Sequence, residues 1–339
     1  MKKRSKANIL LGVSLGAVLM GVAPSASAQS TMLGGTGLLR VQSAEAIVPG
    51  QLNVTAHGLS FVEARDNASM LVKDFTLNAS LTFALSETFE LTAGMALYQD
   101  DGQQLTPMPG DTRLGLKVVP FRWNSVRLGV YPMVVLPTAE YHNVPFEPYS
   151  SGKTAAALMG IATFDLWRTF PVAPLKAHVN VGYLDHDLTD RFFTARVDQV
   201  LMGVGIKVPV RSSYLFTEYT GEIFLNNSSV RWYQNSQRLT QGLRFLGPFS
   251  LVCDLALDVS LTRRAEVEDE FHKRYADWKV TVGVSRRFTV FRQLDRKARE
   301  ARLRQLEAQR EAERLRQRRE QAAREMEAMK KELEKPEKP

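Results

Sequence analysis

The chain has 339 residues, a formal net charge of +8 and a single cysteine, Cys253. Residues 1–28 carry four basic residues and no acidic one, and residues 292–339 carry sixteen basic and eleven acidic residues, which leaves −1 for residues 29–291. The central part is therefore not basic, which argues against nucleic-acid binding, and one thiol excludes an internal disulfide framework.

Residues 1–28 have the form of a secretory signal. A basic start at residues 2–6 is followed by an apolar run over 9–22 and by the small residues 25–28. This order predicts export and cleavage after Ala28. The apolar run is shorter than the roughly 20 residues that a membrane-spanning helix needs.

Residues 29–50 precede the first predicted strand, and the glycines at 34, 35 and 37 together with Pro49–Gly50 mark turns. Next to a barrel, this segment has three possible arrangements. It enters the lumen as a small plug, lies across the periplasmic mouth, or forms a flexible lead-in.

Residues 51–291 consist of long segments in which apolar and polar residues alternate. In a strand, this alternation places the apolar side chains on one face. Many of the segments run longer than the about 5–6 residues of soluble strands and match the about 9–11 residues of transmembrane strands. Twelve strands are predicted, near residues 51–62, 71–86, 88–99, 111–120, 125–136, 154–166, 174–184, 198–209, 213–225, 237–246, 249–262 and 277–288.

The predicted connections alternate between short and long along the chain, which is typical of an even-stranded outer-membrane barrel. We therefore predict an all-β transmembrane fold, an antiparallel outer-membrane barrel of about twelve strands with both termini in the periplasm. Aromatic residues near strand ends are expected to form two girdles at the lipid interfaces: Phe121, Trp123, Trp167, Phe170 and Phe288 on the periplasmic side, and Phe61, Tyr131, Phe224, Trp232 and Trp278 on the outer side.

The last strand ends at Phe288 and resembles the terminal signal that the barrel-assembly machinery reads, although Arg286 stands where an apolar residue is usual. The expected partners of the barrel are thus outer-membrane lipid and this machinery.

Residues 292–339 change to a helical pattern with a heptad seam of mostly alanine, leucine and methionine. Glu300–Arg304 and Glu320–Arg324 are spaced to form ion pairs along one helix. We expect a charged periplasmic helix. It either self-associates as a coiled coil, binds another periplasmic protein, or stands alone in solvent.

No catalytic set is evident among the five histidines, and His57 and Ser60 fall on opposite faces of their strand. We therefore expect no enzyme activity, no cofactor and no metal site.

The inward faces of the predicted strands carry charges: a basic set on strands four, five and seven, and an acidic set on strands nine and eleven. The candidate lumen charges are Arg113, Lys117, Arg127, Lys176, Glu218, Glu222, Asp254 and Asp258. Two opposed charged walls would steer polar solutes through a narrow pore. The alternative is a filled interior in which these residues pair with one another.

Several short stretches resemble the outer-membrane barrels grouped with phenol-degradation (meta-pathway) transporters: residues 110–117, 136–138, 218–221 and 238–244. Residues 36–45 resemble the start of other outer-membrane barrels. The resemblance covers residues 36–288 and implies uptake of small solutes, hydrophobic ones included, and the charged tail departs from the family pattern. The leading function is thus a passive outer-membrane channel or transporter. The alternative is a structural envelope protein whose tail links the barrel to a periplasmic partner or the cell wall.

Overall fold

The computed structural model describes residues 30–64, 71–100, 109–139, 147–169, 174–210, 213–263, 275–297, 299–301, 303–304, 306–307, 314, 321 and 326. The predicted signal segment lies outside the described residues. The chain divides into two compact units, Met1–Val290 and Phe291–Pro339.

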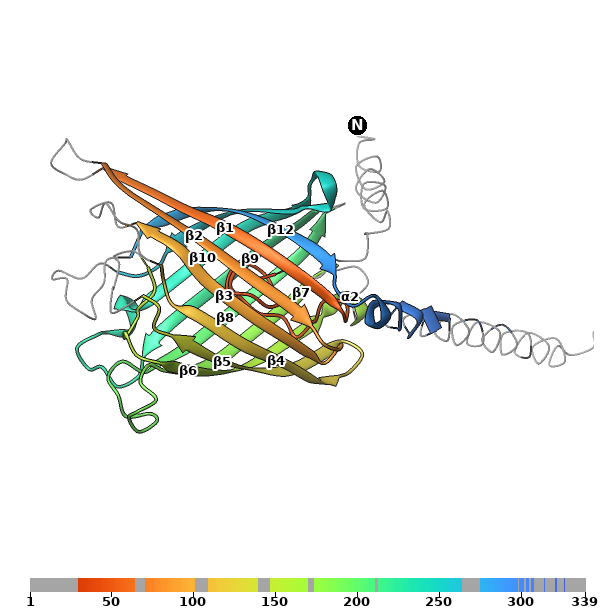
Figure 1. Cartoon of the computed structure of the whole chain (residues 1–339), viewed down its shortest axis with the longest axis horizontal. Coiled ribbons are helices and arrows are strands. Elements are labelled where there is room, and N and C mark those ends of the chain that lie inside the picture. Colours follow the sequence, from red (N-terminus) through yellow and green to blue (C-terminus); the bar gives the residue numbers. More distant parts are fainter. Residues whose placement is uncertain are drawn as a thin grey trace, which may run out of the picture. The chain divides into compact units, whose positions relative to one another are not determined.

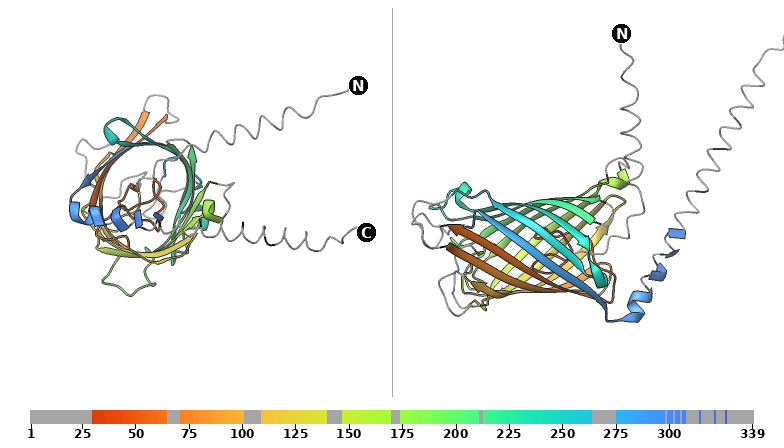
Figure 2. Two further views of the ribbon diagram at one scale, coloured as in Figure 1. Left: turned by 90° about the vertical axis from the view of Figure 1, so that its right-hand side faces the viewer. Right: turned by 90° about the horizontal axis from the view of Figure 1, so that it is seen from above.

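The first unit contains a closed antiparallel barrel of twelve strands (Figures 1 and 2). The barrel closes because β12 pairs with β1, from Gln51 opposite Thr289 to Ser60 opposite Val280. No sheet edge is left unpaired, as a lipid environment requires. The predicted number of strands is confirmed, and the strands are β1 Gln51–Ala64, β2 Leu71–Ala84, β3 Phe89–Asp100, β4 Thr112–Arg122, β5 Val126–Leu136, β6 Ala155–Asp165, β7 Lys176–Asp185, β8 Gln199–Val210, β9 Ser213–Phe224, β10 Ser236–Leu246, β11 Val252–Ser260 and β12 Trp278–Thr289.

The barrel has two different ends. The start of β1 and the end of β12 lie at one end, which we call the terminal rim, and the opposite end is the loop rim. The connections at the terminal rim include only two residues between β8 and β9, and the longest of them contains the short helix α2 (Leu166–Thr169). The longest connection at the loop rim runs from 137 to 154, between β5 and β6. The predicted alternation of short and long connections is thus observed apart from two of them: residues 166–175 form a longer connection at the terminal rim than residues 65–70 do at the loop rim.

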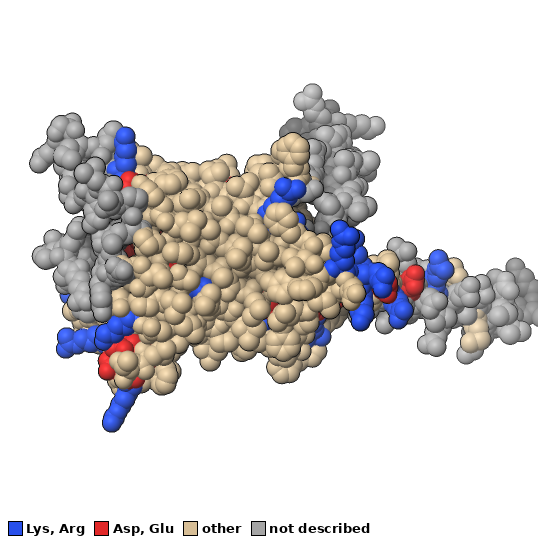
Figure 3. All heavy atoms as spheres, viewed as in Figure 1, with Lys and Arg blue, Asp and Glu red and all other residues tan. Residues whose placement is uncertain are grey.

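The outer surface of the barrel is apolar, and each of the twelve strands contributes at least one exposed large apolar side chain. Strand β11 shows the pattern clearly: Leu255 and Leu257 are 49% and 45% exposed, whereas Asp254 and Asp258 are 2% and 0% exposed. In the face seen in Figure 3, the wall of the barrel carries few charges, and charged residues gather toward its two ends. Apolar residues outside and polar residues inside are the reverse of a soluble fold and match a barrel surrounded by lipid.

The predicted aromatic girdles are partly wrong. Phe61, Tyr131 and Phe224 are buried inside the barrel, because strand alternation places them on the inward face. By contrast, Phe121, Trp123, Trp167 and Phe288 are exposed near the terminal rim, and Trp232 and Trp278 are exposed near the loop rim. Phe170 lies outside the described residues.

Residues 30–50 lie inside the barrel and form what we call the plug. The end-on view in Figure 2 shows this segment crossing the ring of strands. Two short bridges, Ser30 with Thr36 and Gly37 with Gln42, fold it back on itself. Gly34 and Gly35 adopt φ angles of +88° and +89°, which glycine reaches without strain. Gly94 of β3 leaves room for the plug, since a Cβ atom there would lie 2.4 Å from the carbonyl oxygen of Leu33.

In the second unit, the described residues from 292 to 307 are helical, as are residues 314, 321 and 326. Asp295 pairs with Arg299 at 2.9 Å and Arg296 with Glu300 at 3.6 Å, one helical turn apart. The predicted helix is confirmed for these residues, and the coiled coil remains a prediction. No helix among the described residues is long and apolar enough to cross a membrane.

Candidate functional site

The plug occupies the half of the lumen next to the terminal rim, where it is held by a buried carboxylate on one side. Glu90, near the start of β3, accepts hydrogen bonds from the backbone N–H and the hydroxyl of Thr36, both at 2.7 Å. It also accepts one from the N–H of Ile47 at 3.0 Å. Lys117 of β4 pairs with Glu90 at 2.6 Å and neutralises it. One buried ion pair thus holds the plug at two separate points, Thr36 and Ile47.

A buried guanidinium, Arg244 of β10, holds the plug from another side. It donates hydrogen bonds to the carbonyl oxygens of Gly37, Ser30 and Leu38, at 3.0, 3.2 and 3.3 Å. Asp254 of β11 pairs with it and keeps it oriented. Because the partners in the plug are backbone carbonyls, this contact depends on the fold of the plug rather than on its side chains.

The plug also places one charge against each of the two predicted walls. Arg40 pairs with Asp258, and its backbone N–H donates to Glu218 at 2.9 Å. Glu45 pairs with Lys176 at 2.5 Å and with Arg127 at 3.1 Å. The cation of the plug thus meets the acidic wall, and its anion meets the basic wall.

Glu45 stays ionised in this position. Burial favours its neutral form, but the positive charges of Lys176, Lys207 and Arg127 outweigh burial and hold the pKa of the Glu45 carboxyl well below its ordinary range. The docked plug therefore contains a carboxylate that acid protonates only with difficulty.

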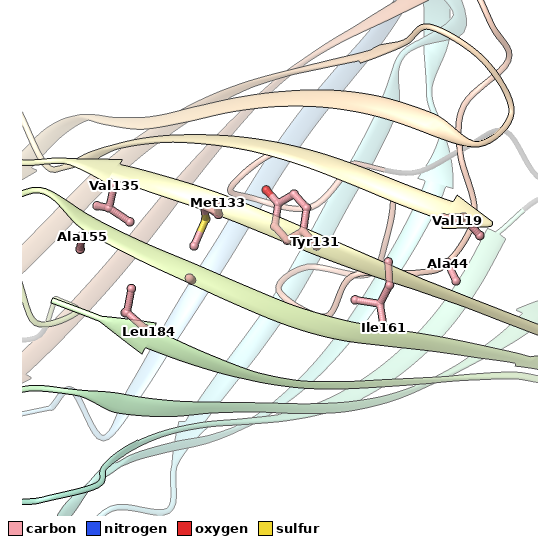
Figure 4. Packing of buried hydrophobic residues seen from close by; sticks show 9 residues of the cluster. Ala44, Val119, Tyr131, Met133, Val135, Ala155, Ile161 and Leu184 are labelled. Carbon is pink, nitrogen blue, oxygen red and sulfur yellow. The ribbon is translucent and has the colours of Figure 1, made fainter. Parts of the chain in front are cut away.

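Apolar contacts complete the docking of the plug. Leu38, Leu39 and Val41 are buried against Phe216 and Ala256 of the barrel. Ala44 packs in a second cluster that includes Val119 and Ile161 (Figure 4). Above the plug, the same cluster continues along β5 to β7 with Tyr131, Met133, Val135 and Leu184, so this sector of the interior is apolar.

A cavity of about 180 Å³ lies between the plug and the loop rim. Its floor is formed by plug residues such as Met32 and Arg40, and loop residues including Tyr149 and Tyr275 line it from the opposite side. Its walls are the loop-rim halves of the strands. They include the apolar sector on β5 to β7 and charged residues on β4, β9, β10 and β12.

The structure separates the eight predicted lumen charges into two groups. The six that touch the plug or its ion-pair partners are Lys117, Arg127, Lys176, Glu218, Asp254 and Asp258. Arg113 and Glu222 instead line the cavity. The sequence did not assign a role to Arg40, Glu45 or Glu90. Glu90 shares an inward register with Thr92, which could have revealed it, whereas the two plug residues have no strand periodicity to place them.

The histidines of the described part of the chain act as partners within the barrel. His57 lies 3.0 Å from Asp254, His178 lies 2.9 Å from Thr163, and His186 lies 3.1 Å from Gln199. The other two, His142 and His272, lie outside the described residues. Within the described ranges, no group of three or more histidine, cysteine or acidic residues is arranged to hold a metal ion.

A closed antiparallel barrel with an apolar outside and a polar, partly filled inside defines a transmembrane β-barrel of the outer-membrane type. The expected class is thus confirmed by the architecture. No protein-family model matches the chain, and no curated protein sequence matches it.

Solved structures with a similar fold include the NanC porin, at 8% identity over 69% of this chain and 98% of that chain, with a TM-score of 0.44. The P. putida toluene transporter TodX shares 10% identity over 70% of this chain and 89% of its own, with a TM-score of 0.34. The CymD monoaromatic hydrocarbon channel shares 9% identity over 72% of this chain and 89% of its own, with a TM-score of 0.36. These likenesses concern the barrel shape and not the solute.

Proposed function

We propose that this protein is a passive outer-membrane channel for small solutes, closed on one side by its own N-terminal plug. The observation that carries the proposal is the cavity between plug and loop rim, which lies inside the barrel and combines charged and apolar walls. A barrel whose interior served only for stability would have no need of such a space. In small barrels the interior is just wide enough for side chains to fill it.

The orientation follows from the two rims. Short turns face the periplasm and longer loops face outward in barrels of this type. The terminal rim, with its two-residue turn between β8 and β9, therefore faces the periplasm in our proposal. Solutes would enter the cavity from outside and meet the plug on the way to the periplasm.

A reversible lock on the plug tests this proposal. The hydroxyl oxygens of Ser30 in the plug and Thr82 in β2 lie 2.8 Å apart. Ser30→Cys with Thr82→Cys, in a Cys253→Ala background, places two thiols at this contact and leaves no third thiol. Single-channel conductance in planar bilayers is then measured before and after reduction.

We expect larger and more frequent conductance steps after reduction than in the oxidised, locked protein. The Ser30→Cys single variant, which cannot form the intramolecular bond, should not respond to reductant. A variant lacking residues 30–45 should conduct steadily. If neither the reduced protein nor this shortened variant conducts, the interior carries no traffic and the channel proposal is wrong.

For the tail, we propose a periplasmic position and a second, structural role as an alternative to transport. The tail is a separate compact unit, and its described residues form a helix with ion pairs of its own. Such a helix offers a charged surface to a protein partner, to the cell wall or to a second copy.

We also propose that the barrel-assembly machinery recognises the strand that ends at Phe288. Replacing Phe288 with Ser should therefore slow barrel assembly in cells.

A further inference from the structure

The charged residues around the cavity are not equally satisfied. Lys279 of β12 pairs with Asp74 at 2.8 Å and with Glu147 at 2.7 Å. Arg40 pairs with Asp258 on the plug side. Both cations therefore have the anionic partner that a buried charge requires, although Nε of Arg40 makes no hydrogen bond.

Arg238 of β10 is different. The residue is only 8% exposed, it lines the cavity, and its Nη1 atom has no hydrogen-bond partner. The side chain of Arg238 makes no hydrogen bond or ion pair with any part of the protein that the structure describes. A buried N–H group without an acceptor is costly, because its hydration is lost and nothing replaces it, and Nη1 is in this position.

Glu222 of β9 provides the complementary group. It also lines the cavity, and its side chain has no ion-pair or hydrogen-bond partner among the described residues. The two side chains come from adjacent strands: Arg238 stands opposite Thr220, and Glu222 stands two residues further along β9. They therefore face the same part of the cavity without pairing with each other.

The loop residue Tyr275 adds a third group. It is buried, it lines the same cavity, and it lies within electrostatic reach of both Glu222 and Arg238. Burial raises the pKa of the Tyr275 hydroxyl, and the negative charge of Glu222 raises it further. The hydroxyl therefore keeps its proton and is available as a hydrogen-bond donor.

The charges near Arg238 decide which kind of molecule fits. The cation of Arg40 and the carboxylates of Asp258, Glu147 and Glu222 all lie within electrostatic reach of Arg238. Arg238 thus has counter-charges near it, but its side chain donates a hydrogen bond to none of them. A simple anion would satisfy the guanidinium but would meet the charge of Glu222. A dipolar molecule satisfies both, because its carboxylate faces Arg238 and its ammonium group faces Glu222.

We propose that this cavity binds a small zwitterion of the amino-acid type, with its carboxylate on Arg238 and Tyr275 and its ammonium group on Glu222. The apolar flank of the same cavity, with Met133 and Leu184, would hold an apolar side chain. The cavity volume of about 180 Å³ suits a single small molecule rather than a peptide. This inference deepens the proposed channel function by giving the class of solute.

Binding to the purified full-length protein in detergent tests the inference independently of conductance. L-leucine is the probe, and two analogues of the same skeleton are its controls: isocaproate, which lacks the ammonium group, and isoamylamine, which lacks the carboxylate. Isothermal titration should show saturable binding of L-leucine and, for each analogue, an affinity weaker by about tenfold or more.

Arg238→Gln and Glu222→Gln should each weaken leucine binding by about tenfold or more, while the loss of either charge should make the site less selective against one analogue. Arg238→Lys, which keeps the charge but not the planar fork, provides a second variant should Arg238→Gln fail to fold. Arg122→Gln is the matched control, because Arg122 lies at the terminal rim and pairs with Glu87. It should bind leucine like the wild type.

Equal affinity for leucine and isocaproate would overturn the inference in favour of an anion site, and absence of leucine binding would overturn it outright. Either result would leave the channel proposal standing if the plug-lock variants conduct as expected. Conversely, leucine binding by a barrel that never conducts would support the site and refute the channel.

Discussion

Replacing Arg244 should release the plug without opening the barrel. The side chain donates three hydrogen bonds to plug carbonyls, and it pairs with Asp254. Removing Arg244 alone would leave the buried carboxylate of Asp254 without its guanidinium partner and would destabilise the barrel itself. The informative comparison is therefore the double variant, Arg244→Gln with Asp254→Asn, against the same protein with both residues intact, because the double change leaves neither charge buried without its partner.

The size of the effect follows from the geometry. A hydrogen bond from a charged donor contributes about 1.5–3 kcal/mol. The contacts to Ser30 and Leu38, at 3.2 and 3.3 Å, are longer than that to Gly37, and all three share one group. We therefore expect about 3 kcal/mol in total rather than the full sum. That value increases the population of released plug about 100-fold.

A thiol inside the plug reports this population. Ser43 is 1% exposed and its hydroxyl donates to the carbonyl of Thr36. In a Cys253→Ala background, Ser43→Cys should react with a thiol reagent only when the plug leaves its site. The labelling rate should rise about 100-fold in the double variant, Arg244→Gln with Asp254→Asn. A change below about threefold in a barrel that still shows heat-modifiable migration would refute the assigned role of Arg244.

Three further results are expected. Gly94→Val should expel the plug, because the new side chain would collide with the carbonyl of Leu33. Gly160→Val on β6 is the control and should leave the plug docked, because a Cβ there would meet only open space and one backbone oxygen at 3.7 Å. Protease sensitivity of the N-terminal segment measures both. Glu45→Gln should loosen the plug at pH 7, as measured by the labelling rate of Ser43→Cys in the Cys253→Ala background. In the same reporter with Glu45 intact, the contribution of Glu45 should be complete above about pH 4.5 and should fall only as the pH drops toward its much lower folded pKa, because a lowered pKa means that protonation opposes docking. Deletion of residues 293–339 should leave conductance unchanged while removing any periplasmic protein that co-purifies with the full chain, and altered conductance would show that the tail belongs to the channel.

The outline of the barrel was predictable because it depends on a local rule. Alternation along a strand separates Leu255 and Leu257 from Asp254 and Asp258, whatever the rest of the chain does. The same rule placed Arg113 and Lys117 on the inward face without any knowledge of their partners. Closure then follows, since twelve such strands with an apolar outer face have no other way to satisfy their edges in lipid.

The inward position of Tyr131 was missed because the girdle prediction followed residue type and neglected register. Tyr131 shares its face with Met133 and Val135, so alternation alone would have placed it inside. Its ring fits there because Gly115 on the neighbouring strand has no side chain; a Cβ at that position would lie 2.5 Å from the ring. Its hydroxyl is then satisfied by Thr92 at 2.8 Å. A glycine in a strand next to a large aromatic residue is the signal that could have corrected the prediction.

The plug was not predictable, for a different physical reason. Its contacts join residues far apart in sequence, such as Arg40 and Glu218, and no period along residues 30–50 encodes them. Most of its hydrogen bonds use backbone groups, including the N–H groups of Thr36, Gln42 and Ala44. Such bonds leave no mark on the sequence of the plug. Their acceptors are polar inward side chains of the barrel strands, so the residues that determine where the plug docks lie in the strands and not in the plug.

This arrangement changes the meaning of the charged walls. Across an empty lumen, opposed basic and acidic sectors would act on a passing solute. Here Arg40 and Glu45 of the plug pair with these sectors through the opposite charge. In the half of the lumen next to the terminal rim, the wall charges therefore mainly hold the plug in place. The cavity-lining charges without a side-chain partner among the described residues, which include Arg113, Arg238 and Glu222, lie in the loop half. Under the proposed orientation a solute meets them before it meets the plug, so selection by charge precedes the step at which the channel is closed.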